Sequence, residues 1–315
     1  MIHPPALEPG DPIRVVSPAG PVTPTLLEPG LSVLRDWGLE VRVDEAVYDR
    51  SDTPGYLAGD DQRRLRAVQS ALDEPDTRAI VFSRGGYGTM RLLAGLELDS
   101  FRDRPKLLVG FSDLTALHLH AAARHRLATL HGPVVKSLRL HTPGDRSMRA
   151  LRDALFGRRA DGFEIDGLHT VSPGQARGPL LGGNLTVLIH MLASDHAPPL
   201  DGSILVLEDI GEEDYRLDRM MTALRLSADS ADPAGIVLGE FIDCDGTYID
   251  PDEVSEFVDE LAAEFDCPVA SGAPVGHGSE NVAWPVGVEA ELDAERGTLT
   301  VESDAAQAPA RATTS

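Results

Sequence analysis

Val109-Gly110-Phe111-Ser112-Asp113-Leu114 places a serine where a short apolar run, residues 106–109, changes into a helical pattern. The run is typical of an interior strand of a parallel sheet, and the leucines and alanines that follow it are typical of a helix packed on that sheet. Gly110 allows a tight turn, which leaves Ser112 at the carboxyl end of the strand, where open α/β sheets bind their ligands. This pattern predicts a nucleophile elbow, with Asp113 capping the new helix; the alternative is that Ser112 is itself a helix cap. Leu114 stands where the second glycine of Gly-x-Ser-x-Gly would be, so the motif is only half met.

The chain on both sides of this turn alternates between strand and helix patterns. Strands are predicted at residues 12–17, 39–44 and 79–82, and helices at residues 25–37, from Asp60 or Asp61 to 72, and from the turn to 124. Strands separated by helices predict a parallel sheet that is covered on both faces. Residues 1–140 are therefore expected to form an α/β domain that carries the nucleophile elbow.

The rest of the chain is expected to contain a linker, a second domain and a tail. Residues 141–178 are richer in proline, glycine and charge, and are predicted to be a linker or the rim of the second domain. Residues 179–302 hold further strands and helices, ending in a hairpin pattern, and form the predicted C-terminal domain. Residues 303–315 are rich in alanine, proline and threonine and are expected to be disordered.

The composition is strongly acidic, with a net charge of −23. Nucleic acid is an improbable partner for such a surface, because phosphate contacts need a basic face. Only Lys106 and Lys136 are lysines, and all other basic residues are arginines. The scarcity of lysine fits a GC-rich genome; together with the acid excess it also fits a halophilic protein, in which salt screens the repulsion between carboxylates.

Other features exclude several classes of protein. No run of 18 apolar residues is present, so no membrane span is expected, and the first residues lack the pattern of a signal peptide, which favours a cytoplasmic location. Cys244 and Cys267 are far from any Cys-x-x-Cys spacing, which argues against a disulfide framework or a thiolate zinc site. His118 and His120 cannot share a helical face, which argues against a metal site there. The chemistry of a serine nucleophile needs neither a metal nor a cofactor, and none is expected.

A serine nucleophile needs a base, and that base needs an orienting acid. Among the ten histidines, His131 could lie near the site, but His277 is favoured because two glycines flank it and predict an exposed imidazole on a special backbone. The acid is predicted to be Glu208 or Asp209, at the end of the apolar run 204–207. The alternatives are a histidine that merely occupies a glycine turn and acids that merely begin the next helix.

The oxyanion hole needs two N–H donors. The amide of Asp113 follows the nucleophile and is the first candidate. Ser83-Arg84-Gly85-Gly86-Tyr87-Gly88 follows a predicted strand and could supply the second; it matches neither a Walker loop nor a dinucleotide-binding loop. An ordinary strand-to-helix turn is the alternative for this segment.

These motifs together resemble the LD-carboxypeptidase family of serine peptidases. Six motifs carry the resemblance and occur in family order over residues 9–302: Ser83–Gly88, Gly110–Asp113, Leu181–Leu185, Glu208–Asp209, Gly276–Gly278 and Asn281-x-x-x-Pro285-x-Gly287. Trp284 is a departure, since many relatives have leucine before the proline.

The resemblance implies a Ser–Glu–His triad, which falls on Ser112, Glu208 and His277, and an oxyanion hole from the amides of Gly86 and Asp113. It implies an α/β N-terminal domain, a smaller β-rich C-terminal domain and a homodimer. The implied substrate is a small peptide such as murein tetrapeptide, cut at an L,D-peptide bond; a sister branch cleaves peptide-nucleotide antibiotics and acyl adenylates.

Recognition of a free terminal carboxylate requires positive charge or N–H groups. Arg84 and Gly85, together with Gly183 and Asn184 at a turn that opens a helix, are the predicted substrate-binding residues; Arg84 could equally be held in a structural ion pair. Two alternatives to the peptidase remain, a non-catalytic small-molecule binding protein and an esterase of the α/β-hydrolase type.

The acidic composition predicts how the stability of the protein depends on salt concentration. Raising KCl from about 0.1 M to about 2 M shortens the Debye length from about 10 Å to under about 3 Å and screens the repulsion between carboxylates. If the acid excess is a salt adaptation, the melting temperature will rise steeply over this range. A melting temperature that stays flat or falls, measured by circular dichroism, would show that it is not.

Overall fold

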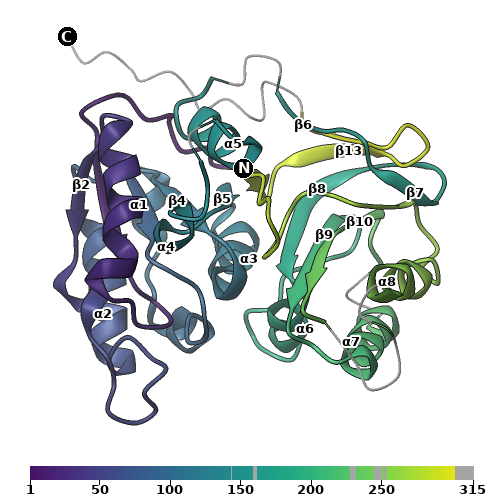
Figure 1. Ribbon diagram of the computed structural model, residues 1–315, viewed down its shortest axis with the longest axis horizontal. Coiled ribbons are helices and arrows are strands. Elements are labelled where there is room, and N and C mark those ends of the chain that lie inside the picture. The colour runs from purple at the N-terminus through teal and green to yellow at the C-terminus, as the bar shows by residue number, and fades with distance from the viewer. Residues whose placement is uncertain (143, 159–161, 228–231, 245–249, 251–252, 302–315) are drawn as a thin grey trace.

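Two sheets, each with its own helices, lie side by side in the structure (Figure 1). The structure is a computed structural model that describes residues 1–142, 144–158, 162–227, 232–244, 250 and 253–301. The tail expected at residues 303–315 lies outside the described residues. Within the described part, no helix is both long enough and apolar enough to cross a bilayer.

The N-terminal sheet has six strands in the order β12-β5-β4-β3-β1-β2. The strands are β1 (Pro12–Val16), β2 (Glu40–Val43), β3 (Ala79–Phe82), β4 (Leu107–Gly110), β5 (Thr129–His131) and β12 (Trp284–Val286). β12 pairs antiparallel with β5, and the other pairs are parallel. The predicted parallel α/β sheet is therefore confirmed, with one antiparallel strand at its edge.

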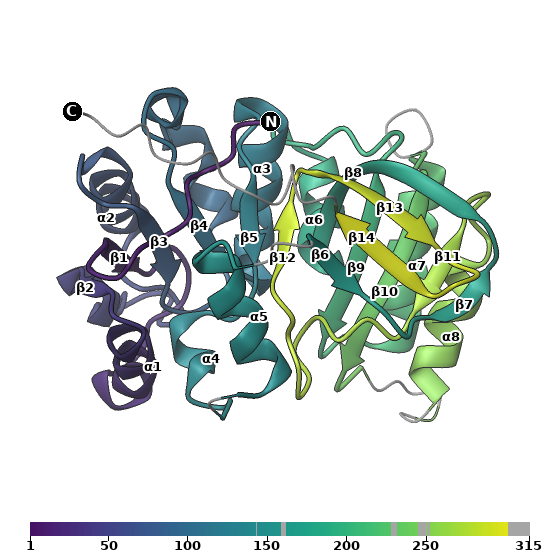
Figure 2. The same ribbon diagram turned by 90° about the horizontal axis from the view of Figure 1, so that it is seen from above.

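Helices cover both faces of this sheet (Figure 2). They are α1 (Pro24–Asp36), α2 (Asp61–Asp73), α3 (Thr115–His125), α4 (Val135–Leu138) and α5 (Arg146–Leu155), with 3-10 turns η1 (Glu45–Tyr48), η2 (Met90–Gly95), η3 (Asp99–Arg102) and η4 (Ser112–Leu114). Side chains of β3 alternate between the faces: Ala79 and Val81 pack with α1, α4 and α5, whereas Ile80 and Phe82 pack with α2 and α3. Asp60 is the N-cap of α2, because its carboxylate accepts the N–H of Arg63 at 2.7 Å.

The second sheet has eight strands in the order β6-β14-β13-β8-β9-β10-β11-β7. The strands are β6 (Phe163–Ile165), β7 (His169–Ser172), β8 (Gln175–Asn184), β9 (Ile204–Ile210), β10 (Gly235–Ile242), β11 (Val269–Ser271), β13 (Glu289–Asp293) and β14 (Thr298–Val301), with helices α6 (Leu185–Leu192), α7 (Asp214–Leu226) and α8 (Val254–Ala262). β8 to β11 are parallel, and β13 and β14 form the predicted terminal hairpin. The carboxyl end of β9 holds Glu208 level with Asn184 of β8.

The segment between the domains is structured rather than extended. In residues 141–178, predicted as a linker, α5 packs into the N-terminal core, while β6 and β7 are the two edge strands of the second sheet. One strand crosses from the second half of the chain into the first sheet. β12 belongs to the predicted C-terminal domain but pairs with β5 of the first sheet. Its Trp284 is fully buried and stacks on His131 at a ring separation of 4.9 Å.

Trp284→Ala is expected to lower the free energy of unfolding by about 3–5 kcal/mol, because it removes a fully buried indole where the chain joins the two domains. Urea unfolding followed by circular dichroism measures the change. The matched control is Leu226→Ala, whose side chain is 76% exposed and which should change stability by less than about 0.5 kcal/mol. Equal, small effects of both substitutions would contradict this role for Trp284.

Candidate active site

Ser112 lies on a strained turn at the carboxyl end of β4. Its φ is +65°, in the left-handed region that non-glycine residues rarely adopt. The turn η4 begins at Ser112, and no side chain caps it, so the alternative role of Ser112 as a helix cap is wrong. The serine is partly exposed and lines a cavity. This is the geometry of a nucleophile elbow.

A buried histidine holds the strand in front of this turn. His118 Nε2 lies 2.8 Å from the carbonyl oxygen of Gly110, and its Nδ1 lies 2.9 Å from Thr129 Oγ1. Burial lowers the pKa of His118 to about 4, so the ring is neutral near pH 7. Nε2 therefore donates to the carbonyl and Nδ1 accepts from the hydroxyl. His118 supports the elbow and does not serve as its base.

Asp113 connects the elbow to the glycine-rich loop at residues 83–88. Its carboxylate accepts the N–H of Thr89 at 2.8 Å, so the prediction that Asp113 caps the following helix is wrong. Burial raises the pKa of Asp113, while the hydrogen bonds from Thr89 and Gly88 act in the opposite direction. The loop lies directly on the nucleophile, because a Cβ added at Gly85 would be 3.0 Å from Ser112 Oγ and 2.9 Å from Ser112 Cβ.

Arg64 also holds this loop, and it was not identified from the sequence. It is fully buried, donates to the carbonyl of Gly88 at 2.9 Å and to that of Pro18, and pairs with Asp61. Burial lowers the pKa of Arg64, although Asp61 and Asp113 act in the opposite direction. The sequence did contain a sign of this role: Arg64 lies on the face of α2 that is otherwise formed by small and aliphatic residues.

His277 and Glu208 form a hydrogen bond, with Nδ1 and Oε2 separated by 2.7 Å. Glu208 is fully buried at the end of β9, and His277 lies in a loop between β11 and β12. A Cβ at Gly276 would lie 3.0 Å from Glu208 Oε2, which explains why glycine precedes the histidine. The ring of Phe111 packs on the imidazole at a centroid distance of 4.8 Å.

The surroundings of His277 raise its pKa. Burial alone would lower it, but the hydrogen bond to Glu208 and the negative charges of Glu208 and Asp209 outweigh burial. Because Nδ1–H donates to the carboxylate, Nε2 is the nitrogen left to accept a proton. The pair has the arrangement of a general base and its orienting acid.

Asp209, the other candidate acid, has a structural role. Its carboxylate accepts hydrogen bonds at 2.8 Å from the Asn184 amide, from the N–H and hydroxyl of Thr186, and from its own neighbour Ile210. It therefore fixes the start of α6, and Glu208 is the acid that contacts the histidine.

The predicted substrate residues Gly183 and Asn184 do not line the cavity that contains Ser112. The N–H of Val187 donates to the Asn184 side chain at 3.1 Å and the N–H of Thr186 donates to Asp209 at 2.8 Å, so these two N–H groups at the helix start are already paired. Gly183 lies against Thr115, because a Cβ there would be 2.5 Å from the Thr115 hydroxyl. The N–H groups of Thr186 and Val187 are therefore not free to bind an anion.

His131, the second candidate base, also lies away from the cavity. It is fully buried beneath Phe111 and Trp284, and burial lowers its pKa well below the ordinary value. It is absent from the cavity lining, whereas His277 is part of it. The choice of His277 over His131 agrees with this geometry.

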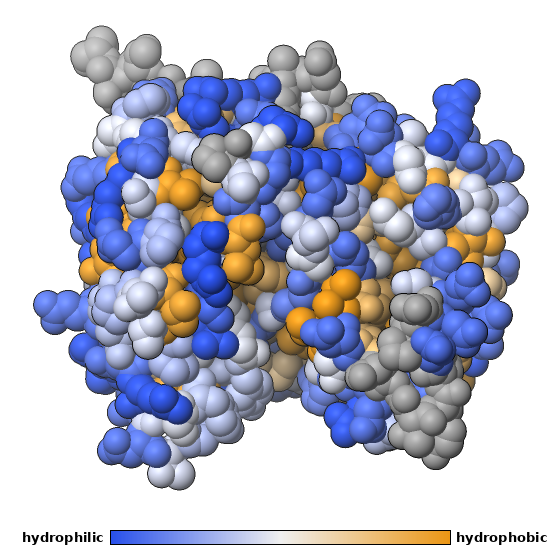
Figure 3. All heavy atoms as spheres, in the orientation of Figure 1, coloured by the Kyte–Doolittle hydropathy of each residue, from blue (hydrophilic) through white to orange (hydrophobic). Residues whose placement is uncertain are grey.

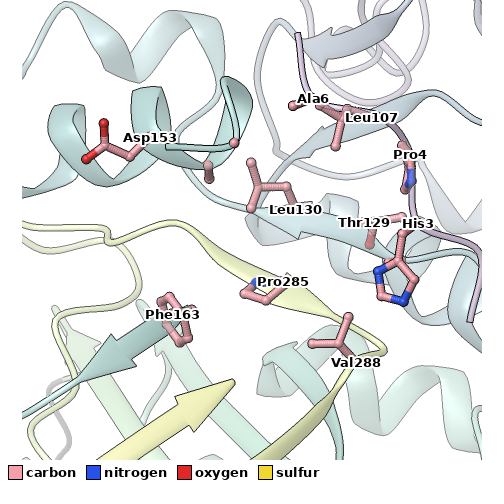
Figure 4. Close-up of a pocket in the computed structure, with 13 residues that line it drawn as sticks. His3, Pro4, Ala6, Leu107, Thr129, Leu130, Asp153, Phe163, Pro285 and Val288 are labelled. Atoms are coloured by element: carbon pink, nitrogen blue, oxygen red, sulfur yellow. The ribbon is translucent and has the colours of Figure 1, made fainter. Parts of the chain in front are cut away.

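Ser112 and His277 line one cavity of about 470 Å³ between the two domains. Figure 3 shows the two lobes separated by a notch, on a face where hydrophilic residues predominate. The lining also includes Gly86 and three basic side chains, Arg84, Lys136 and Arg139. A second, smaller cavity of about 70 Å³ lies among β5, β12, α5 and the N-terminal segment, and its lining contains none of Ser112, Glu208 and His277 (Figure 4).

Known proteins resemble this chain over almost its whole length. Residues 13–132 match the LD-carboxypeptidase N-terminal domain, and residues 177–292 match the LD-carboxypeptidase C-terminal domain. The murein tetrapeptide carboxypeptidase of Pseudomonas aeruginosa is 36% identical over 294 residues, covering 90% of this chain and 94% of that protein.

Solved structures share the fold. A muramoyltetrapeptide carboxypeptidase from Oxalobacter formigenes has a TM-score of 0.76 at 29% identity, covering 91% of this chain and 97% of that one. The microcin C7 self immunity protein MccF, in its wild-type apo state, has a TM-score of 0.84 at 22% identity, covering 95% and 97%; at that identity the likeness shows the fold alone. The chain belongs to the LD-carboxypeptidase family of serine peptidases and is a hydrolase of the carboxypeptidase type.

Proposed function

We propose that this enzyme hydrolyses an L,D-peptide bond and releases a C-terminal D-amino acid, using Ser112, His277 and Glu208 as its catalytic triad. The observation that carries the proposal is the 2.7 Å contact between Glu208 and His277, whose imidazole lines the same cavity as the strained Ser112. The murein tetrapeptide carboxypeptidase among its relatives supports the substrate class.

In the first half of the reaction, Ser112 Oγ forms a bond to the scissile carbonyl carbon while its proton passes to Nε2 of His277. Glu208 holds the ring through Nδ1 and stabilises the imidazolium. As the tetrahedral intermediate collapses, the proton passes from His277 to the leaving amine and the D-amino acid departs. Water then attacks the acyl carbon while His277 takes its proton. The ester bond to Ser112 Oγ breaks, the shortened peptide leaves with a new carboxyl group, and the proton passes from His277 back to Ser112.

The amides of Gly86 and Asp113 are the proposed oxyanion hole. Support comes from the contact of Asp113 with Thr89, which holds the Gly86 loop beside the nucleophile, and from the close approach of Gly85 to Ser112. Gly86 has a φ of +120°, a backbone conformation that favours glycine. Two preorganised donors stabilise the charge that develops on the carbonyl oxygen.

The family resemblance also supports a homodimer, and the acidic composition supports a halophilic protein. Light scattering at low and at molar KCl measures the mass in solution against the 33.7 kDa of one chain. A mass of one chain under both conditions would remove the homodimer from the proposal.

Ser112→Ala and His277→Ala are each expected to lower kcat by about 10⁴-fold or more, and the double variant should be scarcely slower than either, because the residues act as a unit. The measurement is release of D-alanine from an L,D-tetrapeptide with a free carboxyl end, followed by mass spectrometry. The L,L-isomer is the control substrate and should be cut far more slowly. Near-normal turnover by Ser112→Ala would exclude the serine mechanism, and peptide binding without any turnover by the wild type would favour the non-catalytic alternative.

Glu208→Gln is expected to move the acid limb of the kcat/KM profile to lower pH. The general base must be neutral, so this limb follows the pKa of His277, which Glu208 raises above 6.5. Removing the charge lowers that pKa and extends activity to lower pH, while the plateau falls by less than in Ser112→Ala.

Glu240→Gln is the matched control for this shift. Glu240 is a second acid beside the same loop, in contact with Gly278, but Glu208 and Asp209 are the acids that raise the pKa of His277. The control variant should leave the acid limb in place. An equal shift in both variants would show that general negative charge, and not the Glu208 contact, sets the pKa.

A further inference from the structure

Lysine is nearly absent from this sequence, yet one of its two lysines is in the wall of the active-site cavity. The other, Lys106, is buried and donates to the backbone carbonyls of Ala71 and Glu74, which is a structural role. Lys136 lies in the second position of α4 and is partly exposed to the cavity. Its backbone N–H donates to the carbonyl of Ser83 at 2.8 Å, which fixes α4 beside the glycine-rich loop and Ser112.

Arg84, the cation predicted to bind a substrate carboxylate, already has partners. Its Nε donates to the carbonyl of Gly85 and its Nη1 to that of Pro21, both at 3.0 Å. Burial lowers its pKa. Arg84 therefore braces the loop against residues 20–21, and its free hydrogen-bonding capacity is reduced.

Among the described residues, the ammonium group of Lys136 forms neither a hydrogen bond nor an ion pair. Burial and the positive charges of Arg84 and Arg139 lower its pKa, and no acid opposes them. No aspartate or glutamate belongs to the cavity lining. In a chain of net charge −23, three basic groups therefore share one cavity without a carboxylate to neutralise them. A bound anion would relieve this repulsion and take up the free donors of the lysine.

We propose that Lys136 is the specificity-determining residue that binds the terminal carboxylate of the departing D-amino acid, with Arg139 at the rim adding charge. This inference rests on the proposed function and adds the group that recognises the substrate's end. A cation in the same cavity as the nucleophile also restricts cleavage to the last bond. Each additional residue would move the terminal carboxylate by about 3.3–3.6 Å and separate it from the ammonium.

The test compares an L,D-tetrapeptide as free acid with the same peptide as C-terminal amide. In the wild type, kcat/KM should favour the acid. Lys136→Met should reduce the acid-to-amide ratio by roughly 10- to 100-fold, the range for a lost charge-assisted hydrogen bond, mainly through a higher KM for the acid. Lys136→Arg should restore most of the preference, because it returns the positive charge.

Arg296→Gln is the charge-matched control. It removes one positive charge from an exposed side chain that lies 3.7 Å from Asp293 in the β13–β14 hairpin, away from the cavity lining. Its acid-to-amide ratio should equal that of the wild type. An equal loss of preference in this variant would point to long-range charge and overturn the assignment to Lys136.

Measurements of peptide binding distinguish a failure of this inference from a failure of the proposed function. Calorimetry on Ser112→Ala, with and without Lys136→Met, measures the dissociation constants of the acid and the amide without turnover. Tighter binding of the acid that disappears with Lys136→Met supports the anchor even if the wild type cuts neither peptide, a result that would overturn the proposed function alone. Equal binding of acid and amide to Ser112→Ala, or an acid preference that survives Lys136→Met, overturns the anchor.

Discussion

The hydrogen bond between His277 and Glu208 is useful only if both residues keep a fixed position relative to Ser112, which follows strand β4 of the other sheet. A misplacement of about 1 Å can cost about 10²-fold in rate. The structure meets this constraint by inserting the histidine loop between β11 of one sheet and β12 of the other. Phe111, next to the serine, packs directly on the imidazole. The two halves of the site are therefore connected on both sides of His277.

Close packing around the nucleophile explains its glycine-rich surroundings. The loop at residues 83–88 approaches Ser112 so closely that a side chain at Gly85 would collide with it. Asp113 and Arg64 hold that loop at adjacent residues, through the N–H of Thr89 and the carbonyl of Gly88. Such buried charged groups are costly unless they are paired, and here their hydrogen bonds also position backbone amides. Stability of the loop and geometry of the site depend on the same contacts.

The sequence predicted features that depend on local pattern. Apolar runs predicted the strands, and the glycines beside Ser112 and His277 predicted their special backbones, because period and steric freedom are local properties. It could not separate Glu208 from Asp209, since adjacent residues on a strand point to opposite sides and the partner lies almost 70 positions away. It missed Arg64 and the sheet membership of β12, which depend on contacts distant along the chain.

The return of β12 into the first sheet has a consequence for the order of folding. Residues 284–286 complete a sheet whose other strands all end by His131, so β5 is an open edge while the intervening chain emerges from the ribosome. An unpaired edge strand invites pairing with other chains. The N-terminal sheet must wait for residues 284–286 to be synthesised before its last strand is in place. Synthesis of the catalytic histidine, a few residues ahead of β12, is thereby linked in time to closure of the sheet that carries the serine.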